Sequence, residues 1–189
     1  MSGSQSLLRQ IGTLLRNIKG KMAEYKTKEN CGYIYDVVAV TKVVDGDTLD
    51  AVFDLGFDVM FKSRVRLLGI DTPESRTRDT NEKVYGLLSK KHLKSWVHWA
   101  VMSDRDDIEI QVRCPEKDSR GKFGRILGEI WINCKEDGTE FTGWTNINQW
   151  MCENGYAVAY YGQNKADVQG EHLANREMLA ESGEQEILT

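Results

Sequence analysis

The chain has 189 residues, of which 40% are hydrophobic and 29% are charged, a balance that excludes an intrinsically disordered protein. The formal net charge of −4 argues against a nucleic-acid ligand, but residues 61–125 hold 15 Lys/Arg against 10 Asp/Glu. A polyanion responds to local potential, so this segment predicts a basic patch on an acidic protein. The alternative interpretation is that the charges of this segment form an ordinary solvated face that binds no polyanion.

Residues 4–22 place apolar side chains at helical spacing and otherwise carry Lys and Arg, which predicts a basic amphipathic helix. Such a helix could lie on a membrane surface, dock on a protein partner, resemble an organelle transit segment or pack on its own domain. We therefore divide the chain into an N-terminal extension, 1–30, and a folded domain, 31–189. The segment lacks the apolar core of a secretory signal, and the four cysteines form no CxxC pair. We expect free thiols and an intracellular protein.

The remaining elements follow from apolar periodicity and turn residues. The predicted strands are 34–44, 48–53, 59–70, 108–113 and 125–132, and the predicted helices are 81–102, 146–154 and 166–182. Gly155 and Gly183 end the last two helices as C-caps. This order predicts an α+β fold, a small five-stranded barrel with three helices packed against it.

Two carboxylates stand at the ends of predicted strands, Asp47 and Asp71, and each is followed by threonine. If the barrel brings them together, they offer the hard oxygen ligands that calcium or magnesium prefers. The backbone carbonyl of Thr72 is a further candidate ligand. Taken singly, Asp-Gly and Asp-Thr-Pro are also ordinary turn sequences, so a purely structural role is the alternative.

Three more charged residues fit phosphodiester chemistry. Glu74 follows Asp71 by three positions and is a candidate general base near a metal-bound water. Arg66 alternates with Arg64 on one strand, so both point to the same face, and Arg125 follows a Gly-containing loop. Arginines aimed at one phosphate stabilise the extra charge of a pentavalent transition state. The combination predicts a metal-dependent nuclease.

Four segments resemble the signature stretches of the staphylococcal nuclease (thermonuclease-like) family, in order and at compatible spacing. They are VDGDT (44–48), RLLGIDTPE (66–74), KFGR (122–125) and NQWMCENGYA (148–157). The similarity covers about residues 34–183. It implies an OB-fold barrel and Ca²⁺-dependent hydrolysis of DNA or RNA in single-stranded or flexible regions, which leaves 3′-phosphate ends.

The resemblance also implies roles for individual residues. Asp47, Asp71 and Thr72 would bind calcium, Arg66, Glu74 and Arg125 would be catalytic, and Lys122, Phe123 and Tyr160 would contact the substrate. Glu74 would act as the base or orient the attacking water. Phe123 stands where the family commonly has Tyr, which should weaken nucleotide affinity without changing the chemical step.

Several questions stay open at this point. The ligand types fit magnesium as well as calcium, and the residues do not distinguish DNA from RNA or endonucleolytic from exonucleolytic attack. A non-catalytic barrel that binds nucleic acid or protein, docked through the N-terminal helix, is the alternative function. For the nuclease, we expect a monomeric catalytic domain.

Overall fold

The computed structural model describes residues 32–102, 108–134 and 143–184. The strands are β1 (Tyr33–Asp45), β2 (Thr48–Asp54), β3 (Met60–Leu67), β4 (Ile70–Asp71), β5 (Ile108–Cys114), β6 (Ile126–Cys134), β7 (Gly143–Asn146) and β8 (Val158–Ala159). The helices are α2 (Thr80–Met102), α3 (Ile147–Glu153) and α4 (Lys165–Glu181), with a single 3₁₀ turn, η1 (Lys122–Gly124), between β5 and β6.

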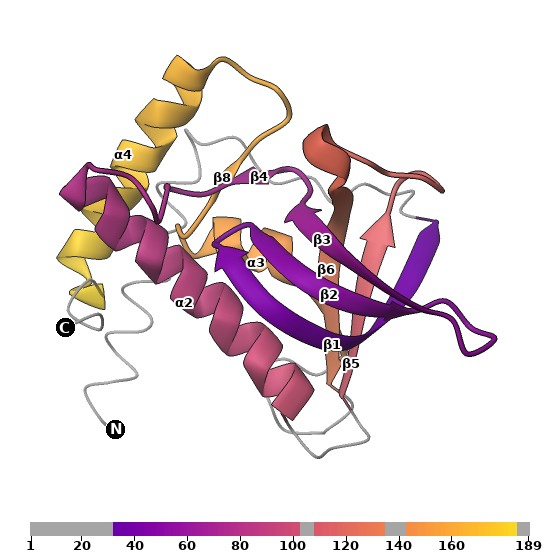
Figure 1. Cartoon of the computed structure of the whole chain (residues 1–189). Coiled ribbons are helices and arrows are strands. Elements are labelled where there is room, and N and C mark those ends of the chain that lie inside the picture. The colour runs from indigo at the N-terminus through magenta and orange to yellow at the C-terminus, as the bar shows by residue number, and fades with distance from the viewer. Residues whose placement is uncertain (1–31, 103–107, 135–142, 185–189) are drawn as a thin grey trace, which may run out of the picture.

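The barrel closes where β3 pairs in parallel with β6, at Val65–Ile126, Arg66–Leu127 and Leu67–Gly128. The order β3-β2-β1-β5-β6 is thereby joined end to end, and β7 adds a strand outside the barrel. In Figure 1, α2 runs along the barrel beside β1, while α4 lies next to the short β4–β8 ladder. The predicted five-stranded OB-type barrel with three helices is confirmed.

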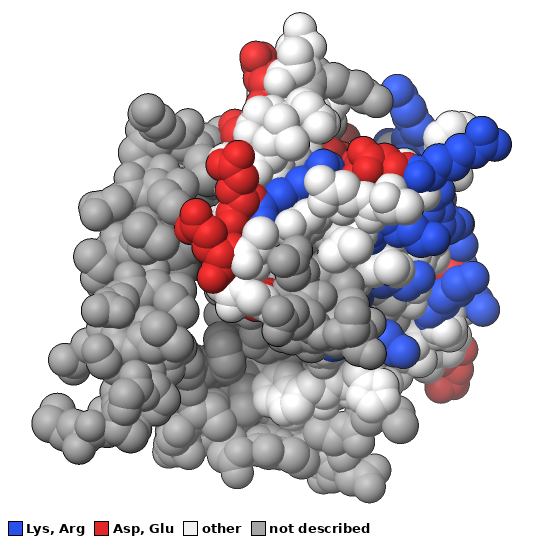
Figure 2. Space-filling model, turned by 90° about the vertical axis from the view of Figure 1, so that its left-hand side faces the viewer, with Lys and Arg blue, Asp and Glu red and all other residues white. Residues whose placement is uncertain are grey.

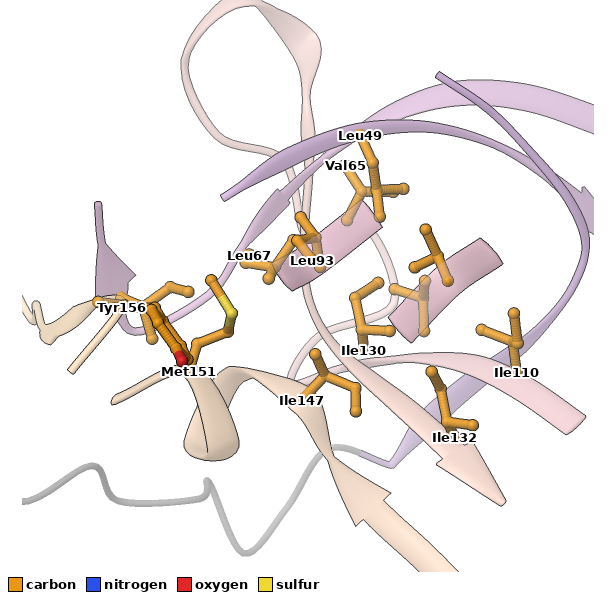
Figure 3. Close-up of a cluster of buried hydrophobic side chains, with 14 of the residues drawn as sticks. Leu49, Val65, Leu67, Leu93, Ile110, Ile130, Ile132, Ile147, Met151 and Tyr156 are labelled. Atoms are coloured by element: carbon orange, nitrogen blue, oxygen red, sulfur yellow. The ribbon is translucent and has the colours of Figure 1, made fainter. Parts of the chain in front are cut away.

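Strict alternation along β2 and β3 decides which side chains reach the surface. Leu49, Ala51 and Phe53 of β2 and Val65 and Leu67 of β3 are at most 1% exposed and form the core. Figure 3 shows this cluster with Leu93 of α2 and Ile130 of β6 packed into it. Because strand side chains alternate between faces, the intervening residues of β3 point away from the core. The position of the polar site is therefore fixed by the apolar packing beneath it.

The prediction of one strand over residues 59–70 is wrong. The chain turns at Leu68 and Gly69, and Gly69 has φ 74°, a left-handed conformation that glycine adopts without a steric penalty. After the turn, Ile70 and Asp71 pair with Ala159 and Val158 in a separate two-stranded sheet. Asp71 is therefore carried by a different ladder from Arg66.

The three predicted helices are confirmed, each starting within one residue of the expected position. Gly155 and Gly183 have φ of 78° and 76°, as expected for residues that follow a helix C-terminus. Among the described residues, Cys114 and Cys152 are in no disulfide, whereas Cys31 and the side chain of Cys134 are not among the described parts. The predicted helix 4–22 and the extension 1–30 also lie outside the described residues. No helix in the described ranges is long and apolar enough to cross a membrane.

A half-buried histidine on α2 predicts a pH dependence of the stability. His92 stacks on Tyr156, with ring centroids 3.9 Å apart, and lies beside Trp150. Burial lowers the pKa of His92 from its ordinary value of 6.5, and Lys91 adds to this while Glu184 opposes it. The unfolded chain therefore binds more protons than the folded chain as the pH drops below 6.5.

We therefore expect the free energy of unfolding to decrease as the pH falls from 6.5 towards the lowered pKa of His92, and this group to have no effect at higher pH. Urea unfolding at several pH values, for wild type and His92→Gln, measures the effect. The difference between the two proteins should shift with pH below 6.5. A difference that stays constant with pH would contradict the assignment.

Candidate active site

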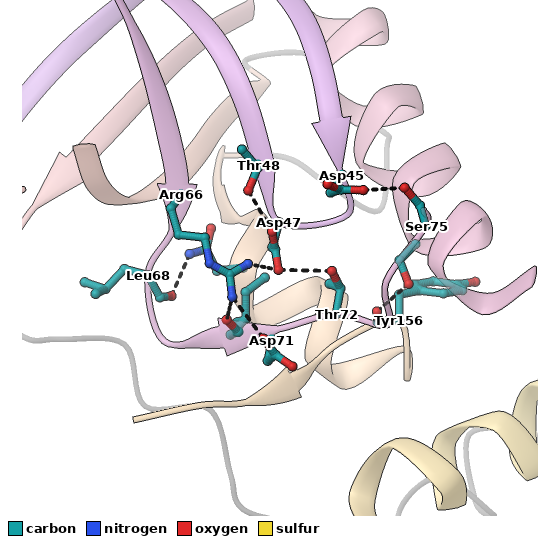
Figure 4. Close-up of polar contacts among 12 residues, drawn as sticks. Asp45, Asp47, Thr48, Arg66, Leu68, Asp71, Thr72, Ser75 and Tyr156 are labelled. Atoms are coloured by element: carbon teal, nitrogen blue, oxygen red, sulfur yellow. Dashed lines mark hydrogen bonds and ion pairs between the residues drawn. The ribbon is translucent and has the colours of Figure 1, made fainter. Parts of the chain in front are cut away.

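Arg66 is the centre of a cluster of charged side chains on the outside of the barrel. Its Nη1 forms an ion pair with Asp47 Oδ2, and its Nη2 donates to Asp71 Oδ1 at 3.0 Å and to the Ile70 carbonyl at 3.3 Å (Figure 4). One guanidinium thus joins a carboxylate from the β1–β2 turn to a carboxylate from β4. The structure brings together the two carboxylates that the sequence places 24 positions apart.

The β1–β2 turn holds Asp47 in a fixed orientation. Asp47 is 7% exposed, and its two oxygens accept hydrogen bonds from Thr48 Oγ1 at 2.8 Å and Thr72 Oγ1 at 3.1 Å. The adjacent Gly46 is required by a close approach, because a Cβ there would lie 2.7 Å from the Cβ of Ser89 on α2. Thr72 therefore contacts Asp47 through its hydroxyl, and the role of its carbonyl as a cation ligand stays a prediction.

Asp71 has a second partner that the sequence did not identify. His172 Nε2 on α4 lies 3.1 Å from Asp71 Oδ2, across 101 positions of sequence. Burial acts to raise the pKa of Asp71, but the hydrogen bond with His172 and the charge of Arg66 outweigh it and hold the pKa below its ordinary value. Asp71 is therefore ionised at neutral pH.

Glu74 is exposed on the segment that follows β4, and its charge acts on Arg66. Its backbone N–H donates to Glu82 Oε1 at 3.4 Å. The segment rests directly on α2 at Gly86, where a Cβ would lie 2.6 Å from both the Glu74 carbonyl carbon and the Ser75 nitrogen. Ser75 Oγ also donates to Asp45. The position of Glu74 therefore depends on Gly86, which lies on α2 and outside the 66–74 segment that contains Glu74.

Arg125 approaches the same cluster from β6. It follows η1 and is half-buried, and its Nε donates to the Lys122 carbonyl at 3.2 Å. Burial is the main cause that lowers the pKa of Arg66, and the charge of Arg125 adds to it, so the two guanidinium groups are neighbours. In the described ranges, Arg125 makes no ion pair, which leaves its charge available to an anion.

The three residues predicted to contact a substrate border this cluster. Lys122 and Phe123 lie in η1, and the Phe123 side chain is 95% exposed. Tyr160 follows β8, is half-buried, and donates its backbone N–H to the Gly69 carbonyl at 2.8 Å. That bond places Tyr160 at the end of the β4–β8 ladder that carries Asp71.

The donor set of this cluster supplies only part of what a hard cation needs. Among the described residues, no group of three or more His, Cys, Asp or Glu side chains converges on one point. Asp47 and Asp71 offer carboxylate oxygens on two sides of Arg66, and oxygen ligands suit calcium or magnesium. Calcium takes about six to eight oxygen ligands, so backbone carbonyls and water would have to supply the rest.

Comparison with known proteins gives a consistent result. A family model described as "Staphylococcal nuclease homologue" matches residues 64–187. An uncharacterized protein of Methanocaldococcus jannaschii is 32% identical over 130 residues, which cover 64% of this chain and 58% of that protein. Protein ParB of Escherichia coli is 28% identical over 130 residues, which cover 67% of this chain and 59% of ParB.

A third relative is the thermonuclease of Staphylococcus intermedius, 33% identical over 97 residues that cover 49% of this chain and 47% of the thermonuclease. The chain spans less than two thirds of the length of each of these relatives. The similarity therefore concerns a shared domain and not the whole of each protein.

Proposed function

We infer that this chain, which belongs to the staphylococcal nuclease family, is a Ca²⁺-dependent phosphodiesterase that cleaves DNA or RNA. The observation that carries the proposal is the binding of both Asp47 and Asp71 by Arg66, with Glu74 and Arg125 close enough for their charges to act on Arg66. Three carboxylates and two guanidinium groups are costly to gather unless an anion or a cation binds among them. The similarity to the thermonuclease of Staphylococcus intermedius supports this function.

The two arginines would bind the scissile phosphate. Arg125 has no ion pair in the described part of the chain, and Arg66 would exchange one of its carboxylate contacts for a phosphoryl oxygen. Their planar forks match two phosphate oxygens. As water adds to phosphorus, the phosphoryl oxygens gain negative charge, and fixed guanidinium groups stabilise that charge without reorganising.

Glu74 would take the proton of the attacking water or orient that water towards phosphorus. The bond that breaks is the one between phosphorus and the 5′ oxygen, and the products are a 3′-phosphate and a 5′-hydroxyl. Asp47 and Asp71, with the Thr72 carbonyl, would hold a calcium ion, which when bound supplies positive charge beside the phosphoryl group. His172 would keep Asp71 ionised and oriented for this task.

The substrate would be a single-stranded or flexible region. Phe123 is an exposed aromatic ring beside Lys122, and Tyr160 lies at the end of the β4–β8 ladder that carries Asp71. Bases that stack on aromatic rings must first leave a duplex, and such stacking is tolerant of sequence.

Cleavage of fluorescent single-stranded DNA and RNA, with analysis of the product ends, tests the proposal. We expect cleavage with calcium, little or none with chelator, and 3′-phosphate ends. Binding without cleavage under every metal condition would contradict the enzyme and favour the non-catalytic module. Products with 3′-hydroxyl ends would contradict the bond assignment.

Gly86→Ala should lower the cleavage rate by at least tenfold. The added methyl would lie 2.6 Å from the backbone of Glu74 and Ser75, so this segment must move by several tenths of an ångström. A displacement of about 1 Å at a reacting group can cost as much as a hundredfold in rate. Rates measured together with the melting temperature separate this effect from unfolding.

Gly170→Ala on α4 is the matched control, because its added Cβ would meet nothing within 4 Å. In a helix interior, alanine is favoured over glycine by about 1 kcal/mol, so this variant should be as stable as wild type or more so, with an unchanged rate. A Gly86→Ala protein with the wild-type rate would show that the placement of Glu74 is not critical.

A further inference from the structure

A row of cationic side chains lies along the outer face of β3. Lys62, Arg64 and Arg66 alternate with Ser63, Val65 and Leu67, of which Val65 and Leu67 are buried in the core. Neighbouring members of the row are about 6.6 Å apart along the strand, and the whole row covers about 13 Å. The row begins at Arg66 in the candidate active site and leads away from it.

This row borders an open groove of about 530 Å³ that continues to Arg125. The charged residues that line it are Asp45, Asp50, Lys62, Arg64, Arg76 and Arg125, so cations outnumber carboxylates by four to two. In Figure 2, Lys and Arg side chains likewise gather along one edge of the molecule, separate from a group of Asp and Glu. The groove is therefore electropositive although the whole chain is acidic.

The carboxylates of the groove do not neutralise all of its cations. Arg64 binds Asp50 through two hydrogen bonds of 2.6 and 2.9 Å, and Arg76 binds Asp45 at 2.7 Å. Lys62 and Arg125 have no ion pair within the described ranges. The Arg64 side chain is 47% exposed, and an exposed pair of this kind is weak enough for Arg64 to contact a second anion.

An exposed aromatic ring completes the groove. Phe123 lines it, is 95% exposed, and has a φ of 63°, in the left-handed region that non-glycine residues rarely adopt. The Arg125 guanidinium lies 5.8 Å from the centre of the ring. Cations in a row beside an aromatic platform are the features by which proteins bind a single strand without regard to its sequence.

We propose that this groove binds the polynucleotide strand beyond the scissile phosphate, with Lys62 and Arg64 contacting successive backbone phosphates and Phe123 stacking on a base. The inference rests on the proposed nuclease function and specifies its substrate as a polymer several nucleotides long. A polynucleotide strand fits this groove better than a flat anionic surface does, because the groove is recessed. Its lining includes the half-buried Ser63 and the buried Thr48, which a narrow strand can reach and a flat surface cannot.

Binding of a fluorescent 12-nucleotide single strand to Lys62→Gln and Lys62→Glu tests the groove, with chelator present to prevent cleavage. Lys94→Glu is the matched control, since Lys94 is an exposed lysine on α2 and makes no contact in the described structure. A dinucleotide with one phosphodiester, measured as a competitor, is too short to reach from Arg66 to Lys62.

Each lost phosphate contact lowers the slope of log K against log salt by about 0.7 for a single strand. We expect this decrease for Lys62→Gln, and for Lys62→Glu a Kd that rises on the order of tenfold for the 12-mer at 0.1 M salt. Lys94→Glu should change Kd by less than about twofold, because Lys94 lies on α2, is not among the residues that line the groove, and carries an exposed charge that salt screens.

Equal effects of Lys62→Glu and Lys94→Glu would overturn the proposal, since net charge alone would then explain the loss. Equal weakening of the 12-mer and the dinucleotide would overturn it as well. If the wild type cleaves no nucleic acid but Lys62→Glu selectively weakens 12-mer binding, the groove assignment stands and the proposed catalytic function fails.

Discussion

Arg125→Ala is expected to lower the rate constant of phosphodiester cleavage by a hundredfold or more, with little change in melting temperature. Removing one preorganised donor to a developing oxyanion costs about 10²–10³ in rate. Stability should be preserved because Arg125 is half-buried and makes one 3.2 Å hydrogen bond, to the Lys122 carbonyl, together with a contact to the exposed ring of Phe123. Single-turnover cleavage with calcium measures the effect on the chemical step.

Arg78→Ala is the control for Arg125→Ala. Arg78 is exposed and has no side-chain hydrogen bond or ion pair within the part of the chain that the structure describes. Its removal tests for a general loss of positive charge and should change the rate by less than about threefold, since an exposed charge that makes no direct contact with the phosphate is screened by salt. If the two variants lose activity to the same extent, Arg125 has no specific role at the phosphate.

Arg66→Met should both inactivate the protein and destabilise it by about 3 kcal/mol in the presence of chelator. The Arg66 side chain is 18% exposed and contacts Asp47 and Asp71, whose side chains are 10% and 36% exposed. Removing one partner of a buried ion pair leaves an uncompensated charge, which typically costs 3–5 kcal/mol. Urea unfolding measures the loss.

Calcium should restore more stability to Arg66→Met than to wild type. Without the guanidinium, the two carboxylates repel each other, and a cation that binds only the folded state stabilises it by mass action. Arg64→Met provides the comparison, because the Arg64 side chain is 47% exposed against 18% for Arg66, so its loss should cost less stability. A stability of Arg66→Met that calcium leaves unchanged would contradict the assignment of Asp47 and Asp71 as cation ligands.

Local sequence patterns predicted the parts of the site that lie within single segments. Alternation along one strand put Arg64 and Arg66 on a common face, and the structure shows that face to be the outside of the barrel. Asp47 and Asp71 were recognised as carboxylates at strand ends, and the barrel and the β4–β8 ladder together place both against Arg66. These features follow from the two-residue period of a strand and from its turns, which short stretches of sequence encode.

Contacts between distant segments were not predictable in the same way. His172 reaches Asp71 because α4 packs beside the β4–β8 ladder, and β8 has two residues, too few for a periodic signal. Gly69 ends β3 inside what looked like one apolar strand. Gly86 matters because the Glu74 backbone crosses α2 at that point, and no pattern along α2 shows such an approach.

Cleavage of a fluorescent single-stranded DNA by wild type and Glu74→Gln, each with calcium, with magnesium and with chelator, tests the central claim most directly. Glu74 is exposed, so the substitution should leave the fold intact. The active-site assignment predicts a calcium-dependent wild-type activity that Glu74→Gln reduces by about a hundredfold or more, the scale of one lost acid–base group. Wild-type cleavage that survives both the chelator and the Glu74→Gln substitution would contradict it.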